Sequence, residues 1–145
     1  MDKSTAQNYE DKLFATETIE MFCDLLSRKD YVLQVFTLIF KNSLDTPEKQ
    51  FLRLGITKTE LMESIKVHSK KMKNGKFVDA EIPMTKKNCD DIINFLTGAT
   101  LIYYSHNEKQ REKPFLLTIR GKQIAKELIE RKLIENPVQS TAHYL

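Results

Sequence analysis

Residues 85–121 constrain the fold of this chain most, because they predict several consecutive elements. Thr85 can cap a helix, and Gly98 stands where a left-handed residue would end it. One face of that helix carries the apolar side chains of Cys89, Ile92, Ile93 and Leu96. Two β-prone runs, 101–104 and 115–117, then flank a charged loop tip. A helix followed at once by a basic two-stranded ribbon can fill a DNA major groove while the loop reaches adjacent phosphates. Double-stranded DNA binding is therefore the leading hypothesis.

Three further helices are predicted ahead of this segment. Apolar residues recur at helical spacing over residues 7–28, and Asp30 can cap a second helix that is apolar nearly all round. A helix with that pattern is expected to be buried. Thr57 with Glu60 three residues later forms a capping box, which marks the start of a third helix.

The end of the chain predicts one more helix. Thr118 can cap it. Its inner face would carry Ile124, Ala125, Leu128 and Leu133. The sequence thus predicts a single domain over residues 1–136, with N-terminal helices in 1–45 and a C-terminal helix in 118–136. Residues 137–145 lack periodicity and are expected to form a flexible tail.

Residues 69–84 permit two interpretations. Asn74-Gly75 is the strongest two-residue hairpin signal, because both positions of a type I′ turn need positive φ. The flanking runs 71–73 and 76–78 would then supply two short strands. A disordered basic loop is the alternative that the sequence leaves open.

Composition and cysteine usage bound the class of protein. The chain has 145 residues, of which 41% are hydrophobic and 30% charged, as in an ordinary soluble globule. Cys23 and Cys89 lie within predicted helices without metal-ligand spacing, which predicts small buried residues in a reducing compartment. No apolar run approaches the roughly 20 residues that span a bilayer, and the N-terminus lacks the apolar core of a signal peptide. A cytoplasmic protein with no membrane contact is expected.

The net charge of +3 is uninformative, whereas its distribution is not. Residues 1–26 hold six acids against two lysines. Residues 66–87 hold seven lysines against two acids, and residues 108–122 hold five basic residues against two acids. This asymmetry is expected of a protein that binds a polyanion, although solvated lysines on exposed faces would give the same pattern.

Residues 85–121 resemble the second half of a winged helix-turn-helix domain of the MarR type, a family of bacterial dimeric DNA-binding regulators. The matching residues are Thr85, Ile92 and Leu96 in the recognition helix, Leu101-Ile102 in the first wing strand, Arg111 in the wing, and Leu117-Thr118-x-x-Gly121 at the next helix. The resemblance implies a mainly α fold with a small β-wing. It also implies helical N-terminal and C-terminal extensions for dimerisation, with the helix-turn-helix and wing in 57–122.

The chain departs from the family pattern at three places. The family usually has glycine where Thr100 stands, and the turn is expected to be displaced to Gly98. Asp90 and Asp91 lie on the recognition helix, where many relatives carry a basic or neutral polar residue. The basic segment 69–84 is an insertion where helix-turn-helix units have a short turn. It would be a second DNA-touching ribbon, a partner-binding element, or a sign that the first helix of the unit lies elsewhere.

The resemblance assigns roles to individual side chains. The candidate DNA-binding residues of the helix from residue 85 are Thr85, Lys86, Lys87, Asn88 and Asp91, those of the 105–114 wing are Lys109, Arg111 and Lys113, and those of the insertion are Lys70, Lys71, Lys73 and Lys76. Helix residues would reach base edges in the major groove, and wing residues the minor groove or backbone. The alternatives are a solvated first turn and a salt bridge of Arg111 with Glu108 or Glu112.

The function predicted from the sequence is a homodimeric transcription regulator that binds double-stranded DNA. Two alternatives remain, a winged-helix adaptor that binds proteins and a plasmid or phage partition or replication protein that binds DNA. No catalytic, metal-ligating or cofactor-binding motif is found, because the three histidines are scattered and phosphate-binding glycine loops are missing. A small-molecule effector has no support in the sequence.

Overall fold

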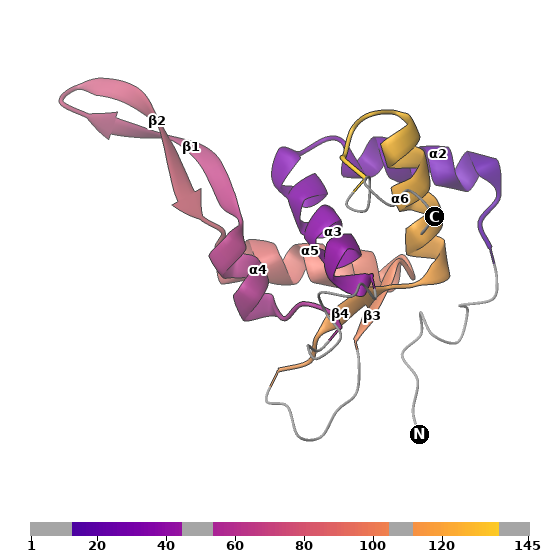
Figure 1. Ribbon diagram of the computed structural model, residues 1–145. Helices are drawn as coiled ribbons and strands as arrows, with labels where there is room; N and C mark the ends of the chain where they lie inside the picture. The colour runs from indigo at the N-terminus through magenta and orange to yellow at the C-terminus, as the bar shows by residue number, and fades with distance from the viewer. Residues whose placement is uncertain (1–12, 45–53, 105–111, 137–145) are drawn as a thin grey trace.

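A computed structural model of the chain describes residues 13–44, 54–104 and 112–136 (Figure 1). The described helices are α2 (Thr16–Leu26), α3 (Asp30–Ser43), α4 (Lys58–Ser64), α5 (Lys86–Gly98) and α6 (Ile119–Glu130). The described strands are β1 (Lys66–Lys73), β2 (Lys76–Pro83), β3 (Ile102–Tyr104) and β4 (Phe115–Leu117). The described helices hold more residues than the strands, which form two small antiparallel sheets, so the fold combines α and β structure. The predicted tail at 137–145 lies outside the described residues.

Helix α3 lies within the core, as its apolar sequence predicts. The side chains of Phe36, Ile39 and Phe40 are fully buried, and α3 packs against both β4 and α6. The hydroxyl of Ser43 accepts a hydrogen bond from the backbone N–H of Leu117 at 2.8 Å. This buried bond joins the end of α3 to β4.

The sheet of β3 and β4 has one further pairing residue. Ile102 lies opposite Leu117 in the antiparallel register of β3 and β4. On the other edge of β4, Ile56 and Phe115 exchange two backbone hydrogen bonds of 2.8 and 3.1 Å. Ile56, which precedes the Thr57 cap of α4, is therefore paired with the β3–β4 sheet. This pairing fixes the start of α4 relative to that sheet.

The three predicted threonine caps are confirmed. The Thr57 hydroxyl accepts from the backbone N–H of Glu60, whose carboxylate in turn accepts from the backbone N–H of Thr57. Thr85 caps α5 and Thr118 caps α6 in the same way, each accepting from the N–H three residues later. These caps set where α4, α5 and α6 begin.

The predicted start of the first two helices is wrong in detail. Residues 13–15 are not helical, because the backbone N–H of Phe14 donates instead to the side chain of Gln123 at 2.8 Å. Residues 7–12 of the predicted 7–28 helix lie outside the described part of the chain. Asp30 is the first residue of α3 rather than its cap, and its carboxylate accepts from the side chain of Gln34 at 2.7 Å.

The predicted ends of α5 and α6 also need correction. Gly98 is helical, and the left-handed residue is Thr100, with φ of 65°. The turn therefore lies at Thr100 and is not displaced to Gly98, contrary to the prediction. The last helix ends at Glu130 rather than at residue 136. Lys132 adopts a φ of 60°, and the backbone N–H of Leu133 donates a hydrogen bond to the carbonyl of Leu128, which closes the end of the helix. Leu133 consequently lies beyond the helix and is exposed, not on its inner face.

The hairpin interpretation of residues 69–84 is confirmed. Asn74 and Gly75 have φ of 53° and 77°, as a type I′ turn requires, and β1 pairs with β2 over all eight residues of each strand. The hairpin leaves the helices beside α4 and projects away from them (Figure 1). Helices α4 and α5 still contact each other across its base, so the insertion does not separate them.

Gly121 permits the closest approach in this fold. A Cβ built on Gly121 would lie 2.3 Å from the carbonyl oxygen of Leu101 and 3.0 Å from the side chain of Leu117. A methyl group does not fit there unless α6 moves away from the sheet. The glycine of the Leu117-Thr118-x-x-Gly121 sequence is thus required by packing, not by a turn.

Gly121→Ala is expected to lower the free energy of unfolding by about 2 kcal/mol, because it overpacks the contact between α6 and Leu101. Gly98→Ala is the matched control. A Cβ at Gly98 meets no atom within 4 Å, and the helical backbone suits alanine, so stability should rise by roughly 0.5 kcal/mol. Urea denaturation followed by circular dichroism measures both changes, and a shift of the same sign in both variants would contradict this packing.

Candidate nucleic-acid interface

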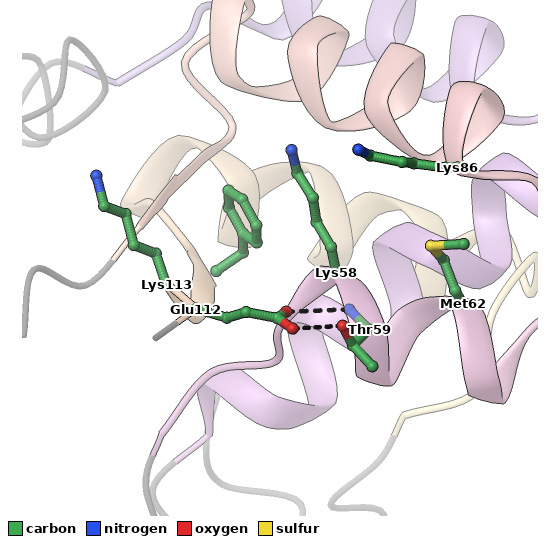
Figure 2. Close-up of a pocket in the computed structure, with 7 residues that line it drawn as sticks. Lys58, Thr59, Met62, Lys86, Glu112 and Lys113 are labelled. Carbon is green, nitrogen blue, oxygen red and sulfur yellow. Dashed lines mark hydrogen bonds between the residues drawn. The ribbon is translucent and has the colours of Figure 1, made fainter. Parts of the chain in front are cut away.

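A hollow of about 500 Å³ lies where the first turns of α4 and α5 meet the residues that lead into β4 (Figure 2). Its lining residues are Lys58, Thr59, Met62, Lys86, Glu112, Lys113 and Phe115. Three parts of the chain that are far apart in sequence therefore share one surface. The Ile56–Phe115 pairing and the contact between α4 and α5 hold these parts together.

Three lysines surround this hollow (Figure 2). Lys58 pairs with Asp90 of α5, with 2.9 Å between its Nζ and the carboxylate. The Nζ of Lys113 lies 4.3 Å from the centre of the Tyr104 ring, a cation–π contact that holds it beside β3. Lys86 is exposed at the start of α5. We name Lys58, Lys86 and Lys113 the lysine cluster.

Glu112 anchors the residues before β4 to the start of α4. Its carboxylate accepts hydrogen bonds from the hydroxyl of Thr59 and, at 3.3 Å, from the backbone N–H of Thr59 (Figure 2). A negative charge at a helix N-terminus is favourable, because the first N–H groups of a helix lack intrahelical partners. Glu112 thus bonds to Thr59 at the start of α4. The alternative pairing with Arg111 lies outside the described residues.

The outward face of α5 carries few charges. Lys87, Asp91 and Asn94 are exposed at positions i, i+4 and i+7, so they follow one stripe along the helix. Asn88 is half-buried, and its backbone N–H is the donor to the Thr85 hydroxyl at 3.1 Å. This stripe is the part of α5 that a groove of DNA could meet directly.

The structure separates the predicted site residues into groups. Lys86 and Lys113 share the first hollow, whereas Asn88 and Asp91 line a second hollow of about 360 Å³ against the turn between α2 and α3. Lys70, Lys73 and Lys76 lie exposed on the projecting hairpin. Lys71 lies in β1 opposite Val78, and its side chain is outside what the structure describes, as are Lys109 and Arg111 altogether.

Three residues of this surface were missed by the sequence prediction. Lys58 and Thr59 directly follow Thr57, the cap of α4. Had the start of α4 been expected to lie beside α5, these two residues would have been predicted to belong to the same surface. Asn94 lies two turns after Lys87, so helical periodicity alone could have predicted its exposure. The proximity of Lys58 to Lys113 depends on the pairing of Ile56 with Phe115, which has no local signal.

Both cysteines are buried, as predicted. Burial raises the pKa of the Cys23 thiol to about 11. Burial, and next the charge of Asp90, raise the pKa of Cys89. Both thiols therefore stay protonated at neutral pH. Within residues 13–44, 54–104 and 112–136, no group of three or more histidines, cysteines or acids could hold a metal ion.

None of the helices that the structure describes combines the length and the apolar character needed to cross a membrane. No protein-family model matches the chain, and comparison with curated proteins and with solved structures yields no match either.

Glu112→Gln is expected to lower the free energy of unfolding by roughly 0.5–1 kcal/mol, because the carboxylate loses its charge at the start of α4. The loss should shrink at high salt, which screens exposed charges. Glu63→Gln, in the last turn of the same helix, is the control and should be neutral or slightly stabilising. Thermal denaturation at 0.05 and 1 M salt measures both, and an equal loss in the two variants would contradict the anchoring role.

Proposed function

We propose that this protein is a homodimeric transcription regulator that binds double-stranded DNA through a winged helix-turn-helix domain. In this arrangement α5 enters the major groove, and the 105–114 segment reaches the minor groove or the backbone beside it. Helices α4 and α5 supply the two helices of the unit, and β3 and β4 supply the ribbon that supports the wing. The packing of α4 against α5 supports this assignment, because the hairpin between them leaves their contact intact.

The lysine cluster carries the proposal. Lys58, Lys86 and Lys113 come from three separate segments and line one hollow beside the N-terminus of α5, with the ammonium group of Lys113 directed away from the other two, over the ring of Tyr104 (Figure 2). In a protein that places α5 in the major groove, the backbone phosphates next to that groove would lie over these ammonium groups. Of the two nearby acids, Asp90 pairs with Lys58 and Glu112 bonds to Thr59, and Lys113 lies over the ring of Tyr104, so Lys86 is the lysine of the cluster best placed to bind a phosphate.

The stripe on the outward face of α5 fits a role in base contact. The side-chain amide of Asn94 can bond adenine at two positions, and Lys87 can bond guanine or a phosphate. Asp91 can accept a hydrogen bond from cytosine N4, whereas a phosphate would repel it. A stripe of mixed charge is more compatible with base edges at the centre of the groove than with the phosphates at its rim.

The double variant Lys86→Ala/Lys87→Ala is expected to weaken binding to duplex DNA by roughly one to two orders of magnitude at 0.1 M salt. Each lost phosphate contact should flatten the plot of log affinity against log salt by about 0.9. Fluorescence anisotropy with a labelled random duplex at several salt concentrations measures both quantities.

Lys122→Ala/Lys126→Ala is the matched control, since it removes two exposed lysines from α6. It should leave the salt slope unchanged. Equal slopes for the wild type and both double variants would rule out the docking proposed for α5.

The proposed dimer contact is the outer face of α2. The inner face of α2 packs against α6 of the same chain, so the outer face is the one available to a second copy. Met21 on that outer face is 47% exposed and lies among the exposed acids Glu17, Glu20 and Asp24. Met21 would thus be the apolar centre of a contact with a polar rim.

Met21→Lys is expected to convert the dimer to a monomer without loss of helix content, because the side chain contacts solvent in the single chain. Met21→Leu keeps the apolar surface and should remain dimeric. Sedimentation equilibrium distinguishes the two states. A wild-type monomer at tens of micromolar would refute the dimer and leave the DNA-binding test intact.

A further inference from the structure

The end of the β1–β2 hairpin exposes two large apolar side chains. Met72 is 65% exposed and Phe77 is 70% exposed. The strand register places them directly opposite each other, so they form one apolar knob on one face of the ribbon. Neither side chain contributes to the hydrophobic core. Large apolar residues held in water in this way mark a contact surface.

The end of the ribbon that carries this apolar knob is basic. Residues 70–79 contain four lysines, Lys70, Lys71, Lys73 and Lys76, and one acid, Asp79, which lies opposite Lys70 in the register. Lys73 and Lys76 face each other in the register and lie next to the turn, on the face opposite Met72 and Phe77. The end of the ribbon from residue 70 to residue 79 therefore carries a net charge of +3.

The shape of the hairpin keeps this end away from its own domain. Strands of eight residues span about 26 Å at roughly 3.3 Å per residue, and the type I′ turn closes them tightly. Figure 1 shows the hairpin leaving the helices at α4 and pointing outward. Among the hairpin side chains that the structure describes, Val67 at the base packs against the core, with half-buried Ile82 opposite it. The end is placed to meet a separate molecule.

Building on the proposed function, we infer that the hairpin end binds the minor groove of the same DNA and inserts Met72 and Phe77 between base steps. Apolar side chains on minor-groove arms unstack neighbouring base pairs and bend the duplex toward the major groove. The lysines of the ribbon would meet the phosphates on both sides of that groove. The lysine–phosphate contacts would position the hairpin end, and insertion of Met72 and Phe77 would bend the DNA.

Charge complementarity favours DNA over a second copy of this chain as the occupant. Two hairpin ends facing each other would bring eight lysines together, four from each, against only the two copies of Asp79. Like charges at an interface oppose association. The phosphates of a duplex supply the opposite charge along both sides of the ribbon.

The test uses the full-length protein with the variant Met72→Thr/Phe77→Thr. Threonine favours strands and both positions are exposed, so the hairpin should stay folded and the melting temperature should change little. Val78→Thr is the matched control, because it makes a nearly isosteric change on the opposite face of the same ribbon. The probe is a duplex of about 30 base pairs with a donor and an acceptor dye at its ends. A second duplex carries 2-aminopurine to report unstacking.

The wild type and Val78→Thr are expected to raise energy transfer between the duplex ends and to raise 2-aminopurine fluorescence. Met72→Thr/Phe77→Thr should lose both signals and bind roughly tenfold more weakly. It should keep the salt slope of the wild type, because its lysines remain.

Bending by Met72→Thr/Phe77→Thr equal to that of the wild type would overturn this inference and leave DNA binding by α5 unaffected. A lower oligomeric state of this variant in the absence of DNA would also overturn it, because the knob would then be a contact between copies. Failure of the wild-type protein to bind duplex DNA at low salt would instead refute the proposed function itself.

Discussion

The buried hydroxyl of Thr118 holds together the elements on which the proposed interface depends. It accepts from the backbone N–H of Gly121 at 3.0 Å and donates to the carbonyl of Thr100 at 2.8 Å. The N–H of Thr118 also donates to the carbonyl of Leu101 at 3.0 Å. A single residue between β4 and α6 thereby fixes the end of α5. Since a buried polar group left without a partner costs on the order of 1–3 kcal/mol, α5 and the ribbon have little freedom to move apart.

The same junction explains why the end of α5 could not be predicted from its glycine. Gly98 is the residue with the lowest local cost for a left-handed conformation, yet Thr100 adopts it. Tertiary contacts select Thr100, because its hydroxyl accepts from the guanidinium of Arg120 at 2.8 Å and the next residue must meet Gly121. The close approach of α6 therefore decides a backbone conformation that local preference assigned elsewhere.

Features with local signals were predictable, and features that depend on distant pairing were not. The caps at Thr57 and Thr85 and the turn at Asn74-Gly75 depend on neighbours within three residues, so the sequence indicates them directly. The pairing of Ile56 with Phe115 joins distant segments and leaves no trace in either one. Because this pairing brings the lysine cluster together, the sequence indicated basic segments but not which lysines share a surface.

The hairpin shows how an insertion can add a surface without disturbing the fold around it. Its two ends are paired, and the N–H of Met84 reaches the carbonyl of Ile65 at 3.4 Å, so the chain returns to where it left. The apolar contact of the ribbon with the core therefore lies at its base, where Val67 packs, and Met72 and Phe77 at its end lie outside the core. Met72 and Phe77 nevertheless lie exposed at that end, with Lys73 and Lys76 next to the turn on the opposite face. Because the stability of the single chain does not account for these two apolar side chains, we propose that they contact a partner, and the net positive charge of the same ribbon end favours a polyanion.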